Sequence, residues 1–158
     1  MFYGMYENSD PFNQERKRTI ANADRYQFNC GGYALNTFSW YCPNPYGVNH
    51  DDYYGFWDEN EAWHKTLLTA GQMVAEFEGR VRIIPSLESI DKRTEYAVAF
   101  RLSSDGDFHF MRKGGNGTWY HKMGRCHEII KITEQEVFRT EWCGGRYDGP
   151  IVLLAVLR

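Results

Sequence analysis

The sequence lacks any long apolar segment. No run of about 18 consecutive apolar residues occurs, and the N-terminal stretch MFYGMYENSDPFNQERKR is polar, without the apolar core of a signal peptide. We therefore expect a soluble, cytoplasmic protein that does not bind membranes. Release by lysis, a secretion apparatus or a phage would be needed to deliver it outside the cell.

A basic stripe is also missing. The chain has 18 Lys and Arg against 21 Asp and Glu, a net charge of −3, and its cations occur singly or in short runs such as ERKR at 15–18. Proteins that bind nucleic acid gather cations on one face. Nucleic acid is therefore not an expected partner, and the sequence does not predict an oligomeric state.

Paired C-x-x-C spacings are absent as well. The four cysteines are Cys30, Cys42, Cys126 and Cys143. This spacing does not match a closed zinc site, and a chain of this size without a signal peptide more often keeps its thiols reduced. We expect no metal and no cofactor.

Three weaker patterns leave metal binding open as an alternative. A zinc site would need the predicted strands to bring its ligands together. For the acidic residues, a polar turn or a solvated loop is a simpler explanation than metal binding. The three sets are His109/His121/Cys126/His127 for zinc, Asp105/Asp107 for calcium, and His50/Asp51/Asp52 for an unspecified metal.

Neither repeats nor a linker divide the chain, so a single domain over 1–158 is expected. Aromatic residues make up 16% of the sequence, which favours a thick core or an aromatic-lined groove. The aromatic loop 46–57 is interpreted either as a wall of such a groove or as a cover over the sheet.

The first half of the chain has helical periodicity. A short surface helix is predicted over 13–26 and a buried helix over 30–41, which ends before Pro43 because proline cannot continue a helix. After a loop over 47–60, Asp58 and Glu61 resemble a capping box. They would begin a second helix that extends to Gly79, with its apolar face formed by Trp63, Leu67, Ala70, Val74 and Phe77.

The second half alternates in the manner of strands. Turn sequences such as SSDGD and KGGNG separate the apolar runs. The pattern is α+β, with N-terminal helices packed on an antiparallel β-sheet. Strands are predicted over 80–84, 95–102, 107–112, 117–122, 127–132 and 150–158.

Two histidines lie within predicted neighbouring strands, His109 in DFHFMR and His121 in GTWYHK. Strand alternation puts Phe108 and Phe110 on one face and His109 on the other. With a three-residue loop over 114–116, Lys113 pairs with Gly117 and His109 lies directly opposite His121. At that distance one imidazole can orient the other.

Cys30 begins the first buried helix and is followed by Gly31 and Gly32. A helix N-terminus favours a thiolate and can hold an oxyanion. Glycines there leave space for a facing strand and a substrate. Taken singly, each of these residues is more often structural, but together they predict a triad of Cys30, His109 and His121.

This order of motifs, NCGGYAL then DFHF then TWYHK, resembles the papain-like cysteine peptidases and amidases, especially the bacterial NlpC-type endopeptidases. The resemblance implies a papain-like fold, with Cys30 as nucleophile, His109 as general base and acid, and His121 as the orienting residue. Asn29 and Gly31 stand where that branch has Asp and Ser, and Phe108 where it has Gly, which leaves the substrate open.

The resemblance implies a phage or bacterial thiol hydrolase that cleaves a peptide or isopeptide bond through an acyl-enzyme. Its substrate would be a peptide or protein, a peptidoglycan peptide among them. Oxyanion or substrate-binding roles fall to Gln27, Asn29, Gly31 and Trp119. Two alternatives stay open: an inactive papain-like binding module, and a glutamine deamidase that uses the same Cys–His pair.

Overall fold

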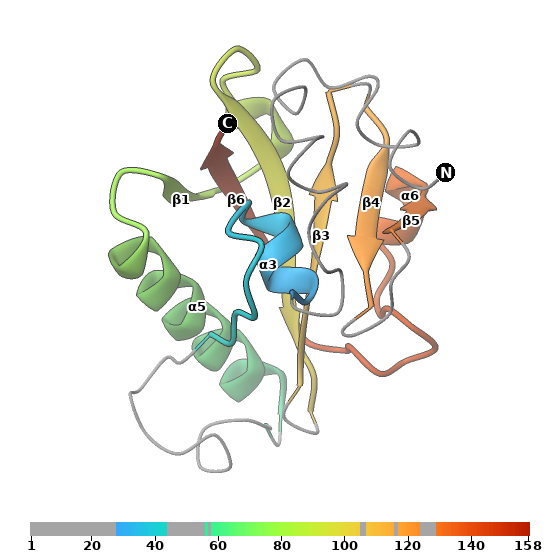
Figure 1. The fold of residues 1–158 in the computed structure, drawn as a ribbon. Coiled ribbons are helices and arrows are strands. Elements are labelled where there is room, and N and C mark those ends of the chain that lie inside the picture. Colours follow the sequence, from blue (N-terminus) through green and yellow to red (C-terminus); the bar gives the residue numbers. More distant parts are fainter. Residues whose placement is uncertain (1–27, 44–55, 57, 105–106, 116, 124–128) are drawn as a thin grey trace.

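The computed structural model describes residues 28–43, 56, 58–104, 107–115, 117–123 and 129–158 (Figure 1). Three sequence predictions fall outside these residues: the surface helix over 13–26, Gln27, and all but a few residues of the loop over 47–60. The potential metal ligands His50, Asp51, Asp52, Asp105, Cys126 and His127 also lie outside them.

A six-stranded antiparallel sheet forms the centre of the described chain, with strand order β1-β6-β2-β3-β4-β5. Each strand coincides with a predicted one to within two residues at either end, so the α+β prediction is confirmed. The strands are β1 (Val81–Ile84), β2 (Glu95–Leu102), β3 (Phe108–Lys113), β4 (Trp119–Lys122), β5 (Ile129–Ile132) and β6 (Val152–Leu157).

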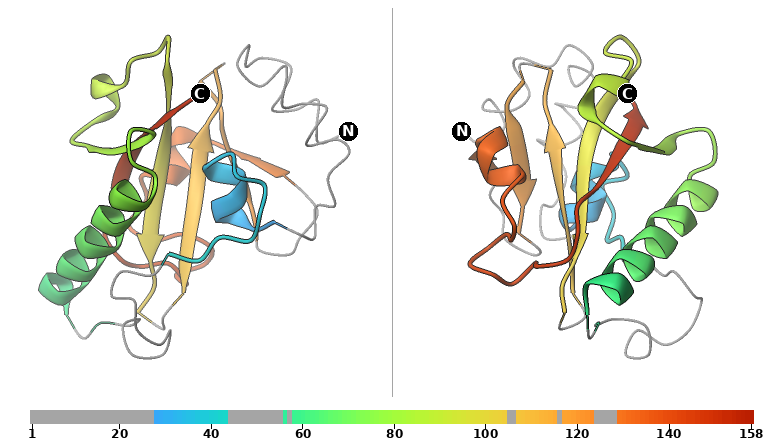
Figure 2. Two further views of the ribbon diagram at one scale, coloured as in Figure 1. Left: turned by 60° about the vertical axis from the view of Figure 1, so that its left-hand side comes forward. Right: turned by 180° about the vertical axis from the view of Figure 1, so that it is seen from behind.

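Helices cover both faces of this sheet. On one face lie α3 (Cys30–Ala34) and α5 (Glu59–Glu76), which pack on an apolar cluster that includes Val98, Phe100 and Leu154. On the other face lies α6 (Glu134–Val137) with the segment that follows it, as Figure 2 shows from behind. A short 3₁₀ helix, η2 (Leu87–Ser89), precedes β2.

The second predicted helix is confirmed as α5, and its apolar face needs a correction. The side chain of Asp58 accepts a hydrogen bond from the Glu61 N–H at 2.8 Å, as the capping-box prediction requires. Trp63, however, is 48% exposed. The rest of the predicted face is confirmed: Ala70 is buried, and Leu67, Val74 and Phe77 are partly buried against the same core. The fully buried residues of the helix are Ala62, Thr66, Thr69, Ala70 and Met73.

The first buried helix is much shorter than predicted. It ends at Ala34 instead of Tyr41, because Asn36 and Phe38 adopt positive φ angles of 58° and 51° and turn the chain back. The N–H groups of Thr37 and Phe38 both bond to the carbonyl of Gly32. Apolar spacing over 34–41 therefore reflects a packed turn.

None of the helices in the described part of the chain is both long and apolar enough to span a membrane.

Candidate functional site

Two buried cations of the sheet fix α3 at its ends. Lys122 of β4 donates to the carbonyl of Phe28 at 2.6 Å, just before the helix. Arg112 of β3 donates to the carbonyl of Tyr33 at 3.1 Å and to the side chain of Asn36 at 2.6 Å, just after it. Cys30, the first residue of α3, is therefore held in place by the strands that carry the histidines.

Asn29 caps this helix. Its side-chain oxygen accepts from the N–H of Gly32 at 3.0 Å and from the N–H of Tyr41 at 3.1 Å, and its amide donates to the carbonyl of Tyr41 at 2.7 Å. Asn29 was a predicted oxyanion or substrate-binding residue. In the structure its amide ties the helix start to the returning chain.

The two glycines after Cys30 make room for the protein's own chain. A Cβ on Gly32 would lie 1.9 Å from the carbonyl oxygen of Ser39, and one on Gly31 would lie 3.0 Å from the ring of Tyr41 and 3.2 Å from that of Phe110. The predicted close approach of a strand is found at Gly31. At Gly32 the space is taken by the turn over 36–41, and no other residue fits there.

The thiol of Cys30 is 4% exposed. Burial raises the pKa of the Cys30 thiol from its ordinary value of 9.0 to about 12, although backbone hydrogen bonds from Phe110 and Gly31 lower it. The expectation of a resting thiolate is therefore wrong, because desolvation outweighs the helix end. Cys30, Cys42 and Cys143 are all free thiols.

His109 and His121 are joined by a hydrogen bond, Nε2 of His109 to Nδ1 of His121, at 2.8 Å. The predicted register is wrong by two residues: Lys113 pairs with Trp119 instead of Gly117, and the Gly114 N–H bonds to the carbonyl of Thr118. Continuing this register places Met111 opposite His121. The two rings meet diagonally, within the reach of long side chains on one face.

His109 is packed between aromatic rings. Tyr147 stacks on it with ring centroids 5.1 Å apart and an interplanar angle of 24°, and Trp142 meets it edge-on at 6.0 Å. The Tyr147 hydroxyl donates to Asp107 at 3.0 Å, and Arg146 donates to the same carboxylate oxygen at 2.7 Å. Asp107 thus anchors the ring that covers His109.

Both imidazoles are neutral in this environment. Burial lowers the pKa of His109 well below its ordinary value of 6.5, and the neighbouring His121 and Arg146 lower it further. Burial also lowers the pKa of His121, to about 4. One imidazole of the pair must donate and the other accept, so they share one proton along the Nε2–Nδ1 line.

Cys30 and His109 come from opposite faces of the sheet and line the same cavity. Cys30 belongs to the apolar cluster with Phe108 and Phe110, whereas His109 stacks on Tyr147 on the other face. Both line one cavity of about 420 Å³. Among the described residues, no hydrogen bond joins the two side chains. The cavity is lined by Asn29, Cys30, Trp40, Cys42, Asp107, Phe108, His109, Met123, Arg146 and Tyr147.

Sequence reasoning missed Arg146 and Tyr147 and assigned Asp107 to a turn. Asp107 lies 39 and 40 positions from these partners, so local sequence gives no signal for the contact. Of the remaining predicted residues, Gly31 is buried in α3. Trp119 is fully buried and donates to Glu134 at 3.2 Å, away from the cavity lining.

Within the described ranges, no group of three or more His, Cys, Asp or Glu side chains could hold a metal ion. Comparisons with protein-family models, with curated proteins and with solved structures found no match to this chain. The site is therefore interpreted from its own geometry.

Proposed function

We propose that the protein is a papain-like thiol hydrolase of amide bonds, in which Cys30 is the nucleophile, His109 the general base and acid, and His121 the orienting residue. One observation carries the proposal: the 2.8 Å hydrogen bond between the two imidazoles, at a cavity that Cys30 also lines. Because Nε2 of His109 is engaged by His121, Nδ1 is the nitrogen that remains to take a proton from the thiol.

The pKa shifts define the first step. With the pKa of Cys30 raised to about 12 and that of His109 lowered, the resting pair is a thiol and a neutral imidazole. The sulfur attacks the amide carbonyl while its proton passes to Nδ1 of His109. The imidazolium then protonates the leaving amine as the C–N bond breaks, which leaves a thioester on Cys30.

Water completes the reaction. His109, neutral again, takes a proton from the attacking water, and the thioester breaks to a carboxylic acid and the Cys30 thiol. The backbone N–H of Cys30 is the expected donor to the oxyanion. If the amide is a glutamine side chain the leaving amine is ammonia, so deamidation uses the same steps. A peptide or protein is the proposed substrate, a peptidoglycan peptide among them.

A second function, a papain-like binding module without turnover, is favoured by one observation. Cys30 is 4% exposed and no hydrogen bond in the described chain links it to His109. A scaffold that only captures a partner has no need of an accessible thiolate.

Acylation by p-nitrophenyl acetate separates these functions. After reaction at pH 8, peptide mass spectrometry would locate the acetyl group. We expect the acetyl group on Cys30 in the wild-type protein and no acetylation at position 30 in Cys30→Ser. The variant Cys143→Ser is the matched control, since Cys143 does not line the cavity, and its Cys30 should be acylated as in the wild type. Acylation of the wild-type protein only at Cys42, Cys126 or Cys143, or at none of its thiols, would contradict hydrolysis and favour the binding module.

The type of amide is then tested with peptide substrates. Ammonia release from glutamine peptides without chain cleavage would identify deamidation, whereas new N-termini in the products would identify peptide hydrolysis.

A further inference from the structure

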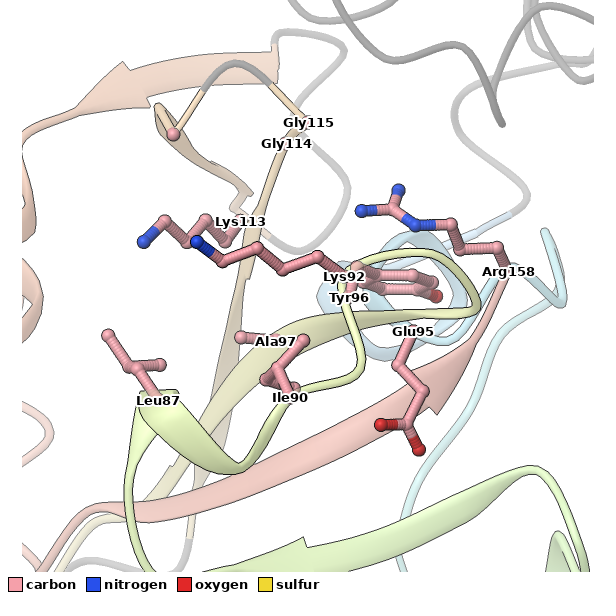
Figure 3. A pocket seen from close by; sticks show the side chains of 11 residues that line it. Leu87, Ile90, Lys92, Glu95, Tyr96, Ala97, Lys113, Gly114, Gly115 and Arg158 are labelled. Carbon is pink, nitrogen blue, oxygen red and sulfur yellow. The ribbon is translucent and has the colours of Figure 1, made fainter.

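A second cavity, of about 200 Å³, lies at the opposite end of β3 from Cys30 and His109 (Figure 3). It is formed by the start of β2, the turn between β3 and β4, and the end of β6. Its lining residues are Leu87, Ile90, Lys92, Glu95, Tyr96, Ala97, Lys113, Gly114, Gly115, Gly117 and Arg158.

Cations dominate this cavity. Lys92, Lys113 and Arg158 line it against a single carboxylate, Glu95, in a protein of net charge −3. Glu95 is already engaged: Arg82 donates to both of its oxygens at 2.8 Å, and the N–H of Asp91 donates at 2.9 Å. Figure 3 shows its carboxylate turned away from the three cationic side chains.

The two lysines keep their charge available. No carboxylate of the described residues forms an ion pair with Lys92. Lys113 pairs with Glu134 at 3.1 Å, but both side chains are solvent-accessible, so this pair contributes little and exchanges readily for a stronger anion. An anion that enters the cavity would therefore meet the charge of Lys92 directly and that of Lys113 in exchange for Glu134.

The turn adds backbone donors to these charges. Gly114 N–H bonds to Thr118 and Gly117 N–H to Gly114, whereas the N–H of Gly115 makes no hydrogen bond with the described residues. Gly117 has a φ of 84°, which favours glycine. Because Gly114, Gly115 and Gly117 carry no side chains, a tetrahedral anion can approach the backbone at these three positions.

The remaining wall is apolar. Leu87, Ile90 and Ala97 line it, together with the ring of Tyr96. Tyr96 is fixed by its hydroxyl, which donates to the carbonyl of Ala34 at 2.7 Å, and by Arg112, which lies 4.2 Å from the ring centroid. A ligand that reaches the cations can therefore place a small ring or alkyl group against a rigid surface.

We propose that this cavity binds the phosphate group of a small phosphate monoester. Lys92, Lys113 and Arg158 neutralise the dianion, and its oxygens approach the backbone of the glycines that line the cavity. The wall of Leu87, Ile90 and Tyr96 covers the organic part. The volume of about 200 Å³ suits a phosphate with a compact substituent and is small for a nucleotide.

Calorimetric titration at constant ionic strength tests this site with three probes: inorganic phosphate, phenyl phosphate and benzoate. We expect phenyl phosphate to bind on the order of tenfold more tightly than phosphate, because its ring buries apolar area. Benzoate should bind much more weakly than phenyl phosphate. Equal binding of benzoate and phenyl phosphate would overturn the phosphate assignment, and no binding of phenyl phosphate would overturn the site.

Variants locate the binding. Lys92→Ala and Lys113→Ala should each weaken phenyl phosphate by about tenfold, while Lys92→Arg keeps its affinity. Lys65→Ala, on α5, is the matched surface control and should change nothing. If Lys65→Ala and Lys92→Ala weaken binding equally, the interaction is non-specific and the proposal fails.

Two further measurements complete the test. Amide NMR shifts on titration should be largest at Gly114, Gly115 and Gly117, and shifts confined to other residues would contradict the site. A phosphoserine peptide that binds more tightly than phenyl phosphate would overturn the small-molecule assignment in favour of a phosphoprotein. Cys30→Ala should bind phenyl phosphate normally, so the outcome is independent of the proposed hydrolase.

Discussion

His109 and His121 lie toward one end of the β3–β4 hairpin, and Lys113 and the turn glycines lie at the other. At the histidine end, aromatic rings exclude water and the two imidazoles are neutral and bonded to each other. At the lysine end, charged groups surround a cavity and keep contact with solvent. One hairpin thus carries two buried, mutually bonded imidazoles and a set of solvated charges, and the difference arises from what packs on each end.

The largest expected effect separates the two ends by reactivity. Replacement of His109 by Ala should lower the rate of Cys30 acylation by about 100-fold or more, because it removes the proposed general base. Lys113→Ala should leave this rate unchanged. His121→Ala should have a smaller effect than His109→Ala, because it removes only the orienting hydrogen bond. Similar rates in all four proteins would remove the histidines from the mechanism.

The next largest expected effect is a loss of folding stability at acidic pH, through His121. His121 has a folded-state pKa of about 4 against an ordinary 6.5, so the unfolded chain binds a proton that the folded one does not between these values. Its contribution to stability is fully present above pH 6.5 and is lost as the pH falls toward 4. The expected loss for this group is about 3 kcal/mol.

Urea unfolding measured from pH 7 to pH 4 checks this expectation. His121→Gln should flatten the acid limb of the free energy of unfolding, whereas Lys92→Ala should keep the wild-type slope. An acid limb in His121→Gln as steep as in the wild type would contradict a buried neutral imidazole at this position.

A smaller effect concerns the residue that covers His109. Tyr147→Phe removes the hydrogen bond to Asp107 and should lower the free energy of unfolding by about 1 kcal/mol. Acylation of Cys30 should slow a few-fold, since the ring stays but its anchor is lost. Lys92→Ala should change stability by less than about 0.5 kcal/mol, as usual for a surface side chain. Equal stability of Tyr147→Phe and the wild type would show that the anchor is not needed.

Local sequence was sufficient to predict the strands and the second helix, α5. Alternation over 95–102 and the turns on either side predict β2, and Asp58 caps α5 as expected. These features depend on residues within a few positions of one another, where side-chain chemistry fixes backbone geometry. Strand alternation, together with the assumed three-residue loop, also places His109 and His121 on the same face.

Other features depend on distant contacts. The register between β3 and β4 differs by two residues from the predicted one, since Lys113 pairs with Trp119 instead of Gly117. Only the pairing of the hairpin with β2 and β5 decides between two positions of its glycine-rich turn. Likewise, the helix after Cys30 stops at Ala34 because its glycines pack on Ser39 and Tyr41. Apolar spacing cannot distinguish that packed turn from a longer helix.

The sequence by itself determined an antiparallel sheet with helices before it, and two histidines on one face of a hairpin. Tertiary structure alone decided the protonation of the site: the burial that raises the pKa of Cys30 and lowers that of His109 comes from chain segments far away in sequence. It also brought Tyr147 and Asp107 to His109, and Lys92 and Arg158 to the hairpin turn. The desolvation of a titratable group depends on all the residues packed around it, so it cannot be predicted from the neighbouring sequence.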